Sequence, residues 1–268
     1  MYPRIYAQYF RDFETTSEVF VALPSTAEGD KRWSKIFQPA IRSLDLKPFR
    51  VTERTVSDSI LTDILSGIGR AALVLADVTF QTASDRPPGP NPNVLYELGL
   101  AHAMRLPEEV VVVRGDSLAV EPPFDISHIR YQKFDQAKAK KSVAKIRTLL
   151  SQSLQSLDRT RDEIVQRTLR SLDPDQMRFL HTVRGSNAFD LALFGPDRNA
   201  LYGLGHQDTT EEHLRALARS LTGLGVLAAG DPGKFKKRVY GATPEYRLTK
   251  LGAAVVTKLP PWLATEGA

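Results

Sequence analysis

The chain has 268 residues, 42% of them hydrophobic and 25% charged, a composition typical of a globular protein with enough apolar side chains for one large or two small domains. It contains no cysteine, which excludes disulfide bonds, thiolate nucleophiles and cysteine-bound zinc. No apolar run is long enough to cross a bilayer and the N-terminus lacks the apolar core of a signal peptide, so we expect a cytoplasmic protein without membrane contact.

The net charge and the spacing of the histidines limit which ligands the chain is expected to bind. The net charge of +5 is spread evenly over the two halves of the chain, which permits binding to a polyanion without marking a dedicated nucleic-acid arm. The 5 histidines are not spaced to bring two of them onto one face of a helix. We therefore expect neither a metal site nor a cofactor.

Apolar runs and amphipathic segments alternate over residues 1–135. Short apolar runs predict strands at 19–23, 48–51, 73–79, 109–113 and 129–134. Apolar residues at helical spacing, and a capped helix start at Asn91, predict helices at 30–44, 57–68 and 91–104. This alternation favours the α/β class, with a doubly wound, mostly parallel sheet of five strands. The proline-rich stretch at 84–90 excludes helix and central strand there.

The alternation ends near Asp135, and residues 136–171 are predicted to be helical. Apolar positions indicate one amphipathic helix over 136–157 and a second over 160–171. An amphipathic pattern does not reveal which surface the apolar face covers. The segment is therefore either a connector or a dimer face.

Residues 172–268 have a different organisation. The sequence predicts helices at 173–183, 209–224 and 249–256, a basic hairpin loop at 230–238 and a strand near 246–248. This order resembles a winged helix-turn-helix domain, and the LTKLG segment at 248–252 is similar to the start of the closing helix in such domains. The resemblance implies contact with DNA or with a partner protein. The basic side chains that would contact phosphates are Arg215, Arg219, Lys234, Lys236, Lys237 and Arg238.

A carboxylate is predicted to lie where an open α/β sheet binds its ligands. Asp77 ends the apolar strand near 73–79, and the Asn-Pro-Asn start of the next helix places Glu97 in its first turns. Ligands of such sheets bind beyond the carboxyl ends of the strands. Glu97 is therefore a site candidate from its position alone. The alternative is that Glu97 only satisfies N–H groups at the helix start.

Five further polar side chains share this placement and suit a nucleotide. Arg50 follows a strand and could hold a phosphate, or it could pair with Glu53 at the surface. The side-chain amides of Asn91 and Asn93 could recognise hydroxyls or a base edge of the ligand, but both residues also suit a helix cap. The tyrosine could stack on a base. The substrate-binding candidates are Ser25, Arg50, Asn91, Asn93 and Tyr96.

Three segments together resemble the nucleoside 2-deoxyribosyltransferase-like and TIR-like superfamily over residues 17–135. They are FVALPS at 20–25, ADVT at 76–79 and NPNVLYELGLAHA at 91–103. Members of this superfamily cleave N-glycosidic bonds of nucleosides, nucleotides or NAD with the glutamate of the ELG motif. The resemblance implies that Glu97 is the catalytic residue and that Asp77 lines the same pocket, where it could orient the leaving base or a sugar hydroxyl. The alternative is that Asp77 caps or hydrogen-bonds its own loop. The longer, proline-rich loop at 80–90 departs from the family pattern and leaves the substrate open.

The three parts suggest an overall organisation and function. We expect a deoxyribosyltransferase-like domain at 1–135, a helical connector at 136–171 and a winged-helix domain at 172–268. This order resembles effectors of bacterial antiphage systems, including some retron effectors, and implies a regulated N-glycosidase acting on NAD or a (deoxy)nucleotide. One alternative is a non-catalytic, nucleotide-sensing regulator that binds DNA, and another is an interaction scaffold. TIR-like domains often complete their site by self-association, so the resemblance is also compatible with a homo-oligomer.

Overall fold

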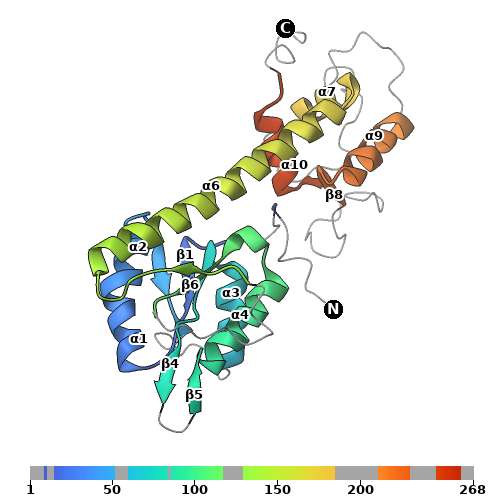
Figure 1. Cartoon of the computed structure of the whole chain (residues 1–268). Coiled ribbons are helices and arrows are strands. Elements are labelled where there is room, and N and C mark those ends of the chain that lie inside the picture. Colours follow the sequence, from blue (N-terminus) through green and yellow to red (C-terminus); the bar gives the residue numbers. More distant parts are fainter. Residues whose placement is uncertain are drawn as a thin grey trace. The chain divides into compact units, whose positions relative to one another are not determined.

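The computed structural model describes residues 9–10, 15–51, 60–83, 86–116, 129–184, 211–229 and 246–260. The chain divides into two compact units, residues 1–160 and 161–268 (Figure 1). Each unit is described by itself.

The first unit is built on a five-stranded sheet. Its strands, in spatial order, are β2 (Lys47–Phe49), β1 (Glu18–Ala22), β3 (Leu73–Asp77), β6 (Val110–Arg114) and β7 (Gln132–Lys133). Every neighbouring pair is parallel, so the predicted α/β class is confirmed and the sheet is wholly rather than mostly parallel. Because β1 lies inside the sheet, the chain first moves outward to β2 and then crosses back to β3.

Helices cover both faces of this sheet (Figure 1). Alternate residues of each strand contribute to two separate cores, as the two-residue repeat of a strand requires. On one face Val19 and Val21 pack with η1 (Trp33–Phe37), which continues α1 (Ala27–Arg32), with α2 (Gln38–Arg42) and with part of α6 (Ala139–Ser171). On the other, Phe20 and Ala22 pack with α3 (Ile60–Arg70) and α4 (Pro92–Met104). A short 3-10 turn, η3 (Pro107–Glu109), leads into β6.

The structure contains two features that the sequence analysis did not predict. A small antiparallel hairpin, β4 (Gln81–Ala83) and β5 (Arg86–Gly89), leaves the sheet after β3. It includes two prolines, which a two-stranded hairpin tolerates because one side of each strand is unpaired. The stretch is neither helix nor central strand, as predicted.

The second difference is that α6 is one continuous helix in place of the two predicted ones. No glycine or proline interrupts residues 139–171, so nothing in the backbone breaks it. Its first half buries Ile146, Leu150 and Leu157 in the core of the first unit. The apolar face of that half therefore covers the sheet of its own chain.

The second unit contains the remaining elements. They are α7 (Pro174–Thr182), α9 (Glu211–Gly223), β8 (Leu227–Ala229), β9 (Tyr246–Leu248) and α10 (Lys250–Thr257), with β8 and β9 antiparallel. Asp173 caps α7 and forms a capping box with Gln176. Thr249 caps α10 by accepting a hydrogen bond from Gly252 N. The basic hairpin predicted at 230–238 lies outside the described residues.

Within the described part of the chain, no helix has both the length and the apolar character needed to span a membrane.

Candidate functional site

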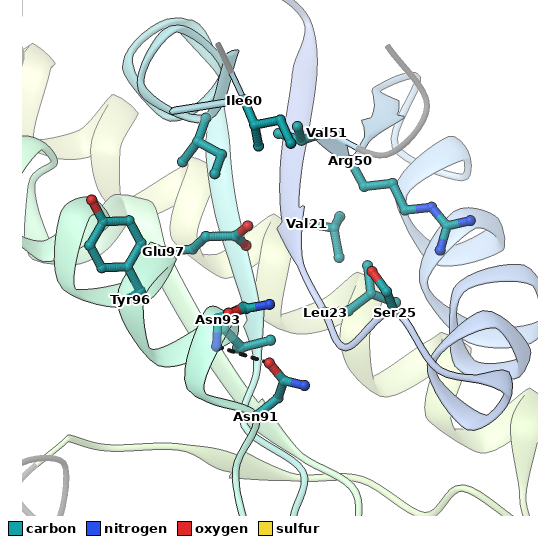
Figure 2. A pocket seen from close by; sticks show the side chains of 12 residues that line it. Val21, Leu23, Ser25, Arg50, Val51, Ile60, Asn91, Asn93, Tyr96 and Glu97 are labelled. Carbon is teal, nitrogen blue, oxygen red and sulfur yellow. Dashed lines mark hydrogen bonds between the residues drawn. The ribbon is translucent and has the colours of Figure 1, made fainter. Parts of the chain in front are cut away.

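A pocket of about 310 Å³ opens at the carboxyl ends of β1 and β2, beside the start of α4 (Figure 2). Its volume lies at the lower end of the range found for small-molecule sites. Residues from four elements and their loops line it: Val21, Leu23, Ser25, Arg50, Val51, Ile60, Ile64, Asn91, Asn93, Val94, Tyr96 and Glu97. Of the seven predicted catalytic and substrate-binding residues, six line this pocket, and Asp77 is the exception.

The strand order explains why the pocket forms there. The connection after β1 leads to the helices on one face, whereas the connection after β3 leads to α4 on the other. The two connections therefore diverge at the carboxyl edge between β1 and β3. Doubly wound sheets bind ligands in the crevice at such a switch point.

Glu97 is the acidic group of the pocket. Figure 2 shows its side chain reaching from α4 into the space between α4 and β1. Burial raises the pKa of Glu97 to about 7, because a carboxylate removed from water holds its proton more tightly. Among the described residues it makes no hydrogen bond or ion pair, so it does not cap the helix start. The Glu97 carboxyl group is therefore not used in contacts with the described part of the chain.

Arg50 is the basic group, on the opposite side of the pocket from Glu97 (Figure 2). Its Nη1 lies 2.7 Å from Oδ1 of Asp30, and its guanidinium lies 5.1 Å from the ring centre of Trp33. Trp33 itself is buried in the core. The predicted surface partner Glu53 lies outside the described residues. The pocket thus has a cation at one side and a titratable acid at the other.

The start of α4 is fixed by a bridge that the sequence did not reveal. Asn91 caps α4 by accepting a hydrogen bond from Asn93 N at 2.9 Å. Its Nδ2 donates to Oε1 of Gln81 at 3.3 Å, and Nε2 of Gln81 donates to Oγ1 of Thr26 at 3.5 Å. Gln81 therefore links the turn that carries Ser25 to the helix that carries Glu97.

The turn after β1 is compact for a steric reason. A Cβ at Gly29 would lie 2.0 Å from the carbonyl oxygen of Pro24, so only glycine fits. Oγ1 of Thr26 accepts from Gly29 N and caps α1. This packing sets the position of Ser25, which is exposed at the pocket edge.

Asp77 does not line the pocket, contrary to what the family resemblance implies. Its side chain is 0% exposed and its Oδ2 accepts a hydrogen bond from Nε of Arg32 at 2.6 Å. Oδ1 accepts from the backbone N and the hydroxyl of Thr79. The carboxylate is thus fully engaged beneath the site, where it joins α1 to the end of β3.

The remaining candidates are placed as follows. Tyr96 lines the pocket and is 55% exposed, which leaves its ring accessible at the rim. Arg215 and Arg219 lie one turn apart on α9 and are both exposed. The other four basic candidates, Lys234, Lys236, Lys237 and Arg238, lie outside the described residues. No cluster of side chains suited to a metal ion occurs in the described ranges.

Comparison with models of protein families found none that matches this chain, and comparison with curated proteins found no match either. The functional argument therefore rests on the pocket and its chemistry.

Proposed function

We propose that the chain is an N-glycosidase that acts in the cytoplasm on NAD or a (deoxy)nucleotide, with Glu97 as its catalytic carboxylate. The observation that carries this proposal is the Glu97 side chain, which enters a pocket at the switch point of the sheet with a pKa raised to about 7 by burial. Strongly perturbed acids in a cleft are typical of catalytic sites.

The chemistry suits such a group. In the first step the C1′–N bond breaks and its electron pair leaves with the base, while a Glu97 oxygen bonds to C1′ or holds the oxocarbenium ion as an ion pair. Water then adds its hydroxyl to C1′, and any C1′–O bond to Glu97 breaks as its electron pair returns to the carboxylate. The proton of that water goes to the departing base or to solvent. The positive charge that develops on the sugar favours the ionised form of Glu97, so a carboxylate half protonated near neutral pH becomes a stronger stabiliser during the reaction.

The other lining residues support a nucleotide-type substrate. The cation of Arg50 and the hydroxyl of Ser25 lie on the same side of the pocket and offer donors for a phosphate (Figure 2). Val51, Ile60 and Val94 give the pocket an apolar lining against which a base can pack. No described residue bonds to the side-chain amide of Asn93, so it can be offered to a substrate, whereas the amide of Asn91 is engaged with Gln81.

Asp77 has a supporting role in this proposal. Because its carboxylate is occupied by Arg32 and Thr79, it holds the carboxyl edge of the sheet and does not touch substrate. We therefore assign it as a positioning residue.

The second unit is proposed to be a winged-helix domain that regulates or targets the enzyme. The order α7, α9, antiparallel β8 and β9, and α10 supports this. Arg215 and Arg219 on the exposed side of α9 suit phosphate contacts with DNA, and the same face could equally dock a protein. A regulated enzyme of this kind fits an effector of antiphage defence.

Product analysis tests the enzymatic proposal. Wild type and Glu97→Gln are incubated with NAD and with a panel of nucleosides and (deoxy)nucleotides, at low and high protein concentration, and free bases are identified by mass spectrometry. Release of one base by wild type alone is expected and identifies the substrate. Saturable nucleotide binding without base release at any concentration would instead favour the alternative, a nucleotide-sensing regulator that binds DNA.

A further inference from the structure

The first half of α6 carries an unusual concentration of positive charge. Residues 136–157 contain five basic side chains and no acidic one, so this segment alone contributes +5, equal to the net charge of the whole chain. The excess of positive charge is therefore similar in the two halves of the chain, but within the chain it is concentrated in this one segment. The five side chains are all exposed: Lys138, Lys140, Lys141, Lys145 and Arg147. Lys138 immediately precedes α6 and the other four lie on it, and we call the five together the basic face of α6.

These charges do not serve the fold. Lys140 and Lys141 lie in the first turn of α6, which contains no acidic residue, and cations near a helix N-terminus oppose the helix dipole. Among the described residues only Lys138 has a carboxylate partner, Asp135 at 3.5 Å, in a pair that is largely exposed. No ion pair to the other four occurs within the described part of the chain. The arrangement is unfavourable for the helix alone, which points to an external anion.

The rest of α6 provides an internal comparison. Residues 158–171 carry four arginines together with Asp158, Asp162 and Glu163, so charges of both signs alternate there. Mixed charge is the ordinary pattern of a solvated helix. The change from a mixed to a purely basic surface within one continuous helix separates the basic face from a general basic bias of the sequence.

A membrane surface, a protein or a nucleic acid could cover such a surface, and the structure favours one of these three. The apolar side of this half of the helix is buried, with Ile146 and Leu150 each 0% exposed, so it has no apolar face to insert into a membrane. No large exposed hydrophobic residue of the described ranges lies on α6, whereas protein interfaces depend on apolar and aromatic anchors. A surface of four lysines and one arginine without such anchors suits a phosphate backbone.

We propose that the basic face of α6 binds the phosphate backbone of a nucleic acid, without reading its sequence. From Lys140 to Arg147 the helix rises about 10 Å, which corresponds to roughly three phosphates along one strand of a duplex. This surface belongs to the first unit, whereas the α9 arginines belong to the second. It goes beyond the proposed glycosidase and does not depend on it.

Salt-dependent binding tests this inference. Fluorescence anisotropy is measured for the full chain with labelled single-stranded and duplex DNA of about 30 nucleotides, at several salt concentrations between about 50 and 200 mM. The variant is Lys140→Gln with Lys141→Gln and Lys145→Gln. The matched control is Arg159→Gln with Arg167→Gln and Arg170→Gln, three exposed arginines on the second half of the same helix.

The two variants lose the same charge, so only the location differs. The lysine variant is expected to weaken binding about tenfold or more and to reduce the slope of log K against log salt by about 2.7 for duplex, as three lost phosphate contacts require. The control is expected to change little. The inference would be overturned if wild type did not bind, if both variants weakened binding equally, or if anionic phospholipid vesicles and not DNA bound to the basic face.

Discussion

Nε of Arg32 lies 2.6 Å from Oδ2 of Asp77, and the two side chains are 5% and 0% exposed. The pair joins the last residue of α1 to the last residue of β3, at the edge of the sheet where the pocket forms. Nη1 of Arg32 also donates to Gln136 at 3.2 Å, which ties in the segment after β7. This buried network fixes three connections of the first unit.

Loss of Arg32 should destabilise the protein strongly. Arg32→Met leaves the Asp77 carboxylate buried without its cation, and breaking such a pair typically lowers the free energy of unfolding by about 3–5 kcal/mol. The exposed neighbour gives the control, because Lys31→Met should change stability by less than about 0.5 kcal/mol. Urea unfolding followed by circular dichroism measures both. Equal effects of the two substitutions would contradict the structural role of the pair.

Gln81 should control the shape of the pocket more than the chemistry. Gln81→Met removes the hydrogen bonds to Thr26 and Asn91, and since each is worth about 0.5–1.5 kcal/mol, KM should rise by up to about tenfold while kcat changes less. Gln81→Glu keeps an acceptor for both partners and should restore much of the loss. Steady-state kinetics on the identified substrate measures this, with the exposed Gln132→Met as control. A fall in kcat alone, not rescued by glutamate, would contradict it.

The raised pKa of Glu97 should make stability fall with pH. The folded protein holds this proton up to about pH 7, whereas an ordinary glutamate has a pKa of 4.5, so the unfolded chain binds fewer protons between these values. The contribution of Glu97 is thus complete below about pH 4.5 and is lost as pH rises through 7. Glu97→Gln should match wild type near pH 4.5 and exceed it by about 1–3 kcal/mol near pH 8, after allowance for partial exposure.

Urea unfolding at the two pH values gives this difference directly. Since the variant changes no other titratable group, a stability difference that is the same at both pH values would mean that the pKa of Glu97 is not raised.

The fold of the first unit could be predicted from the sequence because its central strands β1, β3 and β6 are buried on both faces. Near-continuous apolar runs such as 73–79 have few other interpretations, and their alternation with helices leaves few topologies. The position of Glu97 followed from the same logic, because a helix start after a buried strand lies at the carboxyl edge of the sheet. The spacing of apolar and polar residues within short segments was enough to predict both the sheet and the position of Glu97.

The contacts that shape the site were not accessible in this way. Arg32 and Asp77 are 45 residues apart, and Gln81 joins positions 55 residues before and 10 residues after it. Nothing local marks such partners, since each depends on how the connections fold over the sheet edge. For this reason the sequence left two roles open for Asp77, a contact with substrate and a hydrogen bond to its own loop. In the structure its carboxylate is buried against Arg32 and accepts from Thr79 N, and it does not line the pocket.

Catalysis should require the ionised form of Glu97. Only the carboxylate can bond to C1′ or stabilise the positive sugar, so kcat/KM should fall about tenfold per pH unit below the pKa of about 7 and level off above it. The pH profile of kcat/KM for the free enzyme measures this. A fall in rate above pH 7 would instead assign Glu97 as a proton donor to the leaving base.

The most direct test is the rate at which Glu97→Gln releases free base from the substrate of the wild-type enzyme. The amide has nearly the same shape but carries no charge, so turnover should fall by at least about 10³-fold while the circular dichroism spectrum is unchanged and stability is equal or higher. Retention of most of the wild-type rate by a folded Glu97→Gln protein would contradict the assignment of Glu97 as the catalytic carboxylate.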